Sequence, residues 1–183
     1  MIDYQSIINQ YYKEDTPLRH ILLTHSLQVT QRALSICDSH PELHLDRDFL
    51  EAAAMLHDIG IIGCDAPGIE CYGKEPYICH GIIGAKMLGD TQAMAPYARV
   101  CARHTGAGIT RDEIVRQGLP LPLQDFLPET LEEQVICDAD KFYSKSHLDH
   151  EKTIEEAVRS LRKFGEDGVH RFLDWAEKFE AYR

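Results

Sequence analysis

The sequence predicts an all-α protein. Thr110, Thr130 and Thr153 each begin the pattern Thr-x-x-Glu, the capping box that opens many helices. A further start is Thr16 followed by Pro17, an N-cap with proline at the first helical position. No segment alternates apolar and polar residues as a half-buried strand does. Helices are therefore the regular elements that we expect.

Two long helices are predicted in the N-terminal third of the chain. The first begins at Pro17 and runs through His25 towards Cys37. Asp46 caps the second, which continues through His57 until Gly60 stops it. Glycines and prolines break any periodicity in residues 63–76, so a loop that can border a pocket is expected there.

Further helices are predicted along the rest of the chain, at residues 77–89 and 93–104 and after each of the three threonines. The second of these ends at glycines 106 and 108, and prolines 120, 122 and 128 indicate an irregular connection. An amphipathic closing helix is expected near the C-terminus, with Trp175 at the edge of an apolar stripe. That stripe consists of Val169, Phe172, Leu173, Ala176 and Phe179.

A short sequence recurs within the predicted helices. Gly60-Ile-Ile-Gly63 reappears as Gly81-Ile-Ile-Gly84. Structural repeats need about 20 residues or more, and four are far too few. We interpret the recurrence as coincidence.

Length and composition predict one soluble globular domain over residues 1–183. The chain has 183 residues, 44% of them hydrophobic and 27% charged. The N-terminus lacks the features of a signal peptide and no apolar run could span a membrane, so a cytoplasmic location is expected. The net charge of −11 opposes binding of bulk nucleic acid. A small phosphorylated ligand is compatible with it, because divalent cations can invert the potential inside a pocket.

His57 and Asp58 are the first candidate site residues. They follow an alanine-rich apolar segment, where an imidazole and a carboxylate are costly to bury unless something compensates for their lost hydration. A metal ion would do so. Neutral imidazole and carboxylate suit iron, manganese, cobalt and zinc, and a carboxylate can bridge two ions.

The segment Ala53-Ala54-Met55-Leu56-His57-Asp58-Ile59-Gly60 resembles the signature of the HD superfamily in its H-D-I-G form. An earlier helical histidine and a later aspartate complete that family's pattern, and His25 and Asp140 match them. The resemblance covers roughly residues 18–145 and implies an HD-type helical bundle, on which C-terminal helices over 153–183 would pack. Asp138 competes with Asp140 as the last ligand, and the match favours Asp140.

The resemblance also implies a binuclear metal site. His80 and His104 stand where binuclear members of the family add ligands for a second metal. The implied cofactors are two divalent ions, with iron or manganese favoured and zinc, cobalt or nickel possible. The implied metal ligands are His25, His57, Asp58, His80, His104 and Asp140.

Basic residues near these ligands in the sequence are candidates for holding an anionic substrate. Lys141 directly follows a ligand, so we expect it to act in catalysis together with Asp58. Lys86, Arg103 and Lys145 are expected to bind substrate. Solvated helix faces and ordinary ion pairs are the competing explanation for each of these residues.

The function implied by the resemblance is hydrolysis of a small phosphate ester or anhydride, for which a nucleotide is a suitable substrate. Two metals would activate a water for in-line attack on phosphorus. The six-ligand order also resembles that of HD-type mixed-valent diiron oxygenases, and a non-catalytic module that binds metal or nucleotide is a third reading. The G-Y-P signature of cyclic-dinucleotide phosphodiesterases is missing, and Ile61 stands where that branch has lysine.

Overall fold

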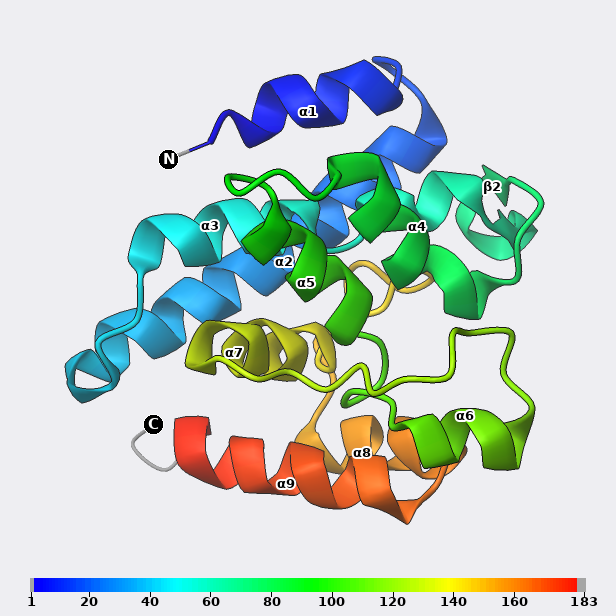
Figure 1. Ribbon diagram of the computed structural model, residues 1–183. Helices are drawn as coiled ribbons and strands as arrows, with labels where there is room; N and C mark the ends of the chain where they lie inside the picture. Colours follow the sequence, from blue (N-terminus) through cyan, green and yellow to red (C-terminus); the bar gives the residue numbers. More distant parts are fainter. Residues whose placement is uncertain (1, 181–183) are drawn as a thin grey trace.

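A computed structural model describes residues 2–180 of the chain (Figure 1). It confirms the all-α prediction, because helices form almost all of its regular structure. The α-helices are α1 (Tyr4–Tyr11), α2 (Pro17–Ser39), α3 (Arg47–Leu56), α4 (His80–Leu88), α5 (Ala95–Arg103), α6 (Arg111–Gln117), α7 (Leu131–Asp140), α8 (Ile154–Arg162) and α9 (Glu166–Glu180).

The predicted helix starts are confirmed. The side chains of Thr16 and Asp46 accept hydrogen bonds from backbone N–H groups in the first turns of α2 and α3. Thr110, Thr130 and Thr153 each form a complete capping box with the glutamate three residues later. These local contacts satisfy N–H groups that the helices leave without an internal partner.

Residues 63–76 are more ordered than the predicted loop. They contain the short antiparallel strands β1 (Asp65–Ala66) and β2 (Cys71–Tyr72), with the 3₁₀ helix η3 (Pro67–Ile69) between them. Gly73 donates a backbone hydrogen bond of 2.7 Å to Cys64. Strands of two residues are too short to leave an alternating pattern in the sequence, which is why the expectation of no strands was wrong here.

The helix that begins after Asp46 ends earlier than predicted. α3 stops at Leu56, and the chain continues as the 3₁₀ helix η2 (Ile59–Gly63). Helix α1 was not expected, and Tyr12 directly follows it. The buried Tyr12 hydroxyl holds the η2 turn in place: it donates to the Ile59 carbonyl at 2.6 Å and accepts from the Ile62 N–H at 3.2 Å. Tertiary contacts therefore set the end of α3 before Gly60 is reached.

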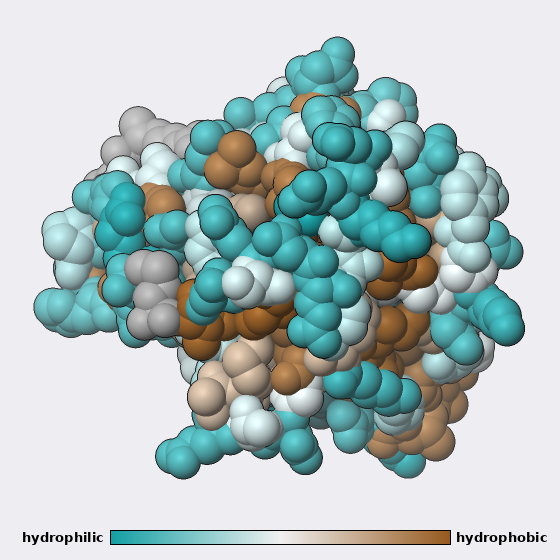
Figure 2. All heavy atoms as spheres, turned by 90° about the horizontal axis from the view of Figure 1, so that it is seen from above, coloured by the Kyte–Doolittle hydropathy of each residue, from teal (hydrophilic) through white to brown (hydrophobic). Residues whose placement is uncertain are grey.

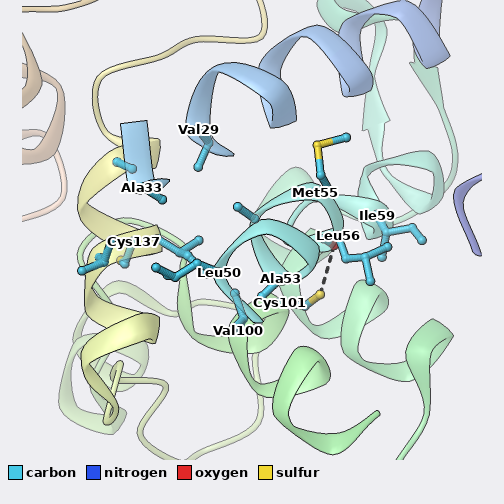
Figure 3. Close-up of a cluster of buried hydrophobic side chains, with 14 of the residues drawn as sticks. Val29, Ala33, Leu50, Ala53, Met55, Leu56, Ile59, Val100, Cys101 and Cys137 are labelled. Atoms are coloured by element: carbon cyan, nitrogen blue, oxygen red, sulfur yellow. Dashed lines mark hydrogen bonds between the residues drawn. The ribbon is translucent and has the colours of Figure 1, made fainter. Parts of the chain in front are cut away.

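The hydrophobic core lies between α2, α3, α5 and α7 (Figure 3). Val29 and Ala33 of α2 face Leu50 and Ala53 of α3, with Val100 of α5 beside them. The thiol of Cys101 donates to the Leu56 carbonyl at 3.3 Å, which ties α5 to the end of α3. This core fixes the ends of several helices relative to one another.

The two Gly-Ile-Ile-Gly segments pack against each other, so their recurrence has a structural consequence although it is no repeat. A Cβ atom on Gly60 would lie 2.1 Å from the His80 carbonyl oxygen and 2.3 Å from the Gly84 nitrogen. A Cβ on Gly81 would lie 2.4 Å from the Cys101 carbonyl oxygen. Glycine lets η2, α4 and α5 approach at backbone distance.

Helices α8 and α9 lie below α7 in the view of Figure 1, with α6 to their right. The buried side chains of Val169, Phe172 and Phe179 confirm most of the predicted apolar stripe of α9. Leu173 was wrongly included: it is exposed, whereas Trp175 is buried, because the contact face is displaced from the predicted stripe towards Trp175. Residues 181–183 of the predicted C-terminal segment lie outside the described residues.

The outer surface is mixed in character. Figure 2 shows a largely hydrophilic face interrupted by separate apolar patches. Within residues 2–180, no helix has both the length and the apolar character needed to cross a bilayer.

Candidate metal centre

Helix ends bring the six predicted ligands together. His57 and Asp58 directly follow α3, His80 begins α4, and His104 directly follows α5. Two further helices complete the cluster, with Asp140 at the end of α7 and His25 inside α2. The four histidines and Asp58 are buried, and 11% of the Asp140 side chain is exposed. Asp138 is not part of the cluster.

The cluster consists of two sets of potential ligands that share Asp58. One set is His25, His57, Asp58 and Asp140, and the other is Asp58, His80 and His104. Asp58 Oδ2 lies 3.1 Å from Nε2 of both His25 and His57. Its Oδ1 lies 3.4 Å from Nε2 of His80 and 3.3 Å from Nε2 of His104. Each oxygen of one carboxylate thus faces a different set.

Local backbone contacts orient three of the histidines in the same way. The Nδ1 atoms of His57, His80 and His104 lie 2.6–2.8 Å from the carbonyl oxygens of Ala54, Tyr77 and Cys101 respectively. Each carbonyl belongs to the residue three positions earlier, so the chain itself sets each ring. A carbonyl can only accept, so Nδ1 carries a proton in each ring and Nε2 is the atom directed at the cluster.

Several polar atoms at the centre of the cluster are poorly satisfied by the described residues. His57 Nε2 and both carboxylate oxygens of Asp58 are fully buried and make no hydrogen bond of good geometry. Nε2 of His80 and Nε2 of His104, two potential acceptors, lie only 3.0 Å apart. Divalent cations would satisfy all of these lone pairs at once, so the residues fit a pair of metal ions.

Burial and the two carboxylates divide the histidines by charge. Burial is the main reason that the pKa of His80 falls to about 3, and it also lowers the pKa of His104. Burial opposes the protonation of His57 too, but Asp58 and Asp140 outweigh it and raise the pKa of His57 to about 9. Without a metal, His57 is therefore a cation at pH 7, while His80 and His104 are neutral.

Two predicted lysines balance the carboxylates. Lys141 Nζ lies 2.7 Å from Asp140 Oδ2 and donates to the His104 carbonyl at 3.3 Å. Lys145 pairs with Asp58 Oδ2. Burial alone would raise the pKa of both carboxyl groups. The pKa of Asp58 is nevertheless held well below its usual range, chiefly by Lys145 and the histidines. Lys141 and the histidines do the same for Asp140.

The ligand cluster opens into a cleft of about 600 Å³. Metal-site residues that reach it include His80, His104 and Asp140, beside Lys141 and Lys145. Lys152, Leu161 and Phe164, from α8 and the segments around it, line the cleft as well.

Lys86 and Arg103, which were expected to bind substrate, do not line this cleft. Both border a separate surface depression, where Arg103 pairs with Glu129 at 2.7 Å and with Glu133 at 3.4 Å. Nearness in the sequence, of Arg103 to His104 and of Lys86 to His80, did not bring either side chain to the cleft, since neighbouring residues of a helix point in different directions. Lys152 was not predicted; it is twelve residues from Asp140, and no sequence signal placed it at the site.

Comparisons with known proteins identify a family that matches most of this chain. The profile of the HD domain family matches residues 22–145. The chain is 31% identical over 156 residues to a tRNA (cytidine(56)-2'-O)-methyltransferase of Picrophilus torridus, covering 80% of this chain and 41% of that protein. It is 28% identical over 170 residues to the methyltransferase of the same name from Thermoplasma volcanium, covering 92% of this chain and 44% of that protein. It therefore spans less than half the length of either enzyme.

A relative of similar extent is an uncharacterized protein of Methanocaldococcus jannaschii. The identity is 30% over 145 residues, which is 78% of each chain. No solved structure matches. Since the family profile covers more than half of the sequence, including His25, the His57-Asp58 pair and Asp140, the chain belongs to the HD domain family.

Proposed function

We propose that this protein is a metal-dependent phosphohydrolase that acts on a small phosphate ester or anhydride. The observation that carries the proposal is the position of Asp58, whose two oxygens face separate sets of histidine nitrogens. A carboxylate placed in this way suits two divalent ions that share it as a bridge. The adjoining cleft gives a substrate access to the same point.

The residues of the cluster have distinct tasks in this proposal. His25, His57 and Asp140 would hold one ion with Asp58, and His80 and His104 would hold the second. Two such ions supply Lewis-acid activation of a water and of a phosphoryl oxygen. The Lys141 and Lys145 ammonium groups lie at the cleft, where they would offset the negative charge that grows on the phosphoryl oxygens.

Metal analysis joined to a phosphate-release screen tests the proposal. We expect about two ions per chain and selective release of phosphate from some phosphorylated metabolites, nucleotides among them. Full metal loading without any hydrolysis would contradict the hydrolase and support a module that only binds metal or nucleotide. A mixed-valent electron paramagnetic resonance signal with dioxygen uptake would instead support the diiron oxygenase.

The two methyltransferase relatives raise a second candidate, a role in tRNA methylation. The match covers 41% and 44% of those enzymes, so their activity can reside in regions that have no counterpart here. The net charge of −11 also opposes contact with a long polyanion. Methyl transfer to tRNA by this chain alone would favour the second candidate; phosphate release without methyl transfer would favour the first.

A further inference from the structure

The cleft is basic in a protein that is acidic as a whole. Lys141, Lys145 and Lys152 all line it, and Asp140 is the acidic residue among the described residues that do so. The whole chain nevertheless carries 30 acidic against 19 basic residues. Two divalent ions would add further positive charge at one end of this cleft. A ligand with a single phosphate would leave much of this charge without a partner.

The three lysines differ in their partners. Lys141 pairs with Asp140 and Lys145 pairs with Asp58, so both ammonium groups are engaged by carboxylates of the metal centre. Lys152 forms no ion pair with any carboxylate in residues 2–180. Lys152 is half-buried all the same, and burial is the main reason that its pKa is lowered. The attraction of Asp140 and Glu156 opposes this change, and Lys141 and Lys145 add to it. Holding an unpaired cation there is costly, which is typical of a site that awaits an anion.

The surroundings of Lys152 suit an anionic ligand. The backbone N–H of Lys152 donates to the Phe142 carbonyl at 2.8 Å, so its main chain is anchored to the segment after α7. Ser144 and Ser146, whose hydroxyls pair with each other at 3.0 Å, line the same cleft and add polar groups to it. The Ser160 hydroxyl also lies there but donates to the Glu156 carbonyl at 2.9 Å. Lys152 and Ser160 both lie beyond residue 145, outside the part of the chain that the family profile matches.

We propose that Lys152 binds a second phosphate group of the substrate, separate from the one that reacts at the metal centre. This inference rests on the proposed function and assigns its substrate class: phosphorylated compounds with at least two distinct phosphate groups. The metal ligands and Lys141 act at the reacting group. Lys152, which lines the same cleft without a carboxylate partner of its own, determines specificity through the distal one.

Adenosine 3′,5′-bisphosphate and adenosine 5′-monophosphate are suitable probes, because they differ by one phosphate. We expect the metal-loaded wild-type protein to bind the bisphosphate about tenfold more tightly in calorimetry, as one well-placed charge-assisted contact provides. Lys152→Gln should abolish this preference and leave affinity for the monophosphate unchanged. Lys86→Gln is the matched control: it removes the same charge from an exposed residue outside the cleft and should retain the preference.

Equal binding of the two probes by the wild-type protein, including no binding of either, would overturn the inference. So would a preference that survives in Lys152→Gln. Phosphate release from other compounds, without a Lys152-dependent preference, would leave the proposed hydrolase standing and remove the distal site. A Lys152-dependent preference without turnover would have the opposite meaning, since the anion site would stand and the hydrolase would not.

Discussion

At the scale of single residues, the chemistry depends on Asp58 more than on any histidine. Asp58 belongs to both sets of potential ligands, whereas His80 and His104 belong to one. If two ions share the centre as proposed, replacing Asp58 should affect both of them, and replacing either histidine should affect the second ion alone. This asymmetry separates a shared centre from two independent sites.

We expect Asp58→Ala to lose both ions and His80→Ala or His104→Ala to lose one, because a ligand set that is short of a donor binds metal much more weakly. Elemental analysis of the purified variants gives the ion count, and circular dichroism checks that they are folded. His20→Ala is the control, since His20 is exposed and outside the cluster. Two ions retained in Asp58→Ala would show that this carboxylate is not a bridge.

Tyr12 is a second residue with a defined task, in stability. Tyr12→Phe removes the hydroxyl that bonds to Ile59 and Ile62 and leaves both backbone groups without this partner. We expect the free energy of unfolding in urea to fall by about 1–3 kcal/mol. Tyr72→Phe provides the comparison, because its exposed hydroxyl contacts only Glu70 and its loss should change stability little. An equal effect of both changes would contradict the role of Tyr12 as a clamp.

At the scale of elements, close packing of η2 on α4 sets the position of His80. Gly60→Ala would bring a Cβ to 2.1 Å from the His80 carbonyl oxygen, and backbone must move to accept it. We expect a loss of about 3 kcal/mol in stability and a lower content of the second ion. Gly68→Ala is the matched control for Gly60→Ala, since a Cβ atom on residue 68 meets nothing within 4 Å. Wild-type metal content and stability in Gly60→Ala would refute this packing argument.

Local signals explain which elements could be predicted from the sequence. The caps at Thr16, Asp46, Thr110, Thr130 and Thr153 act within one turn, so the sequence alone locates them. The end of α3 depends on Tyr12, which lies 47 residues away from Ile59, and such a distant contact leaves no local pattern.

The residues of the candidate site likewise divide into those that the sequence could identify and those that it could not. The six potential ligands could be named because the family resemblance fixes their order, and the structure brings them to one point. Lys86 and Arg103 were named from nearness in sequence, and helix geometry directs them elsewhere. Lys152 reaches the cleft only because the segment before α8 folds back over the end of α7.

At the scale of the whole molecule, the metal centre joins five elements of the fold. Its potential ligands come from α2, α7 and the ends of α3, α4 and α5, so bound ions would act as cross-links that the unfolded chain lacks. Removal of metal by a chelator should lower the melting temperature, and added metal should restore it in a concentration-dependent way. The Asp58→Ala variant should show no such dependence in calorimetric scans. A melting temperature that is the same with and without chelator would exclude a metal that stabilises the fold.

Metal binding should also release protons, with a dependence on pH that follows from His57. Its pKa is raised to about 9 in the metal-free protein, so at pH 7 His57 carries a proton that must leave before Nε2 can bind an ion. His80 and His104 have lowered pKa values and are already neutral there. We expect metal binding at pH 7 to release about one proton per protein, and the affinity for metal to rise between pH 7 and 9. Above that range, metal binding should release no proton from His57 and its affinity should no longer rise for this reason. Calorimetric titration of metal in buffers of different ionisation enthalpy measures the proton count directly. Binding heats at pH 7 that do not depend on the buffer would mean that His57 is neutral before the metal arrives, and the two carboxylates would then not control its charge.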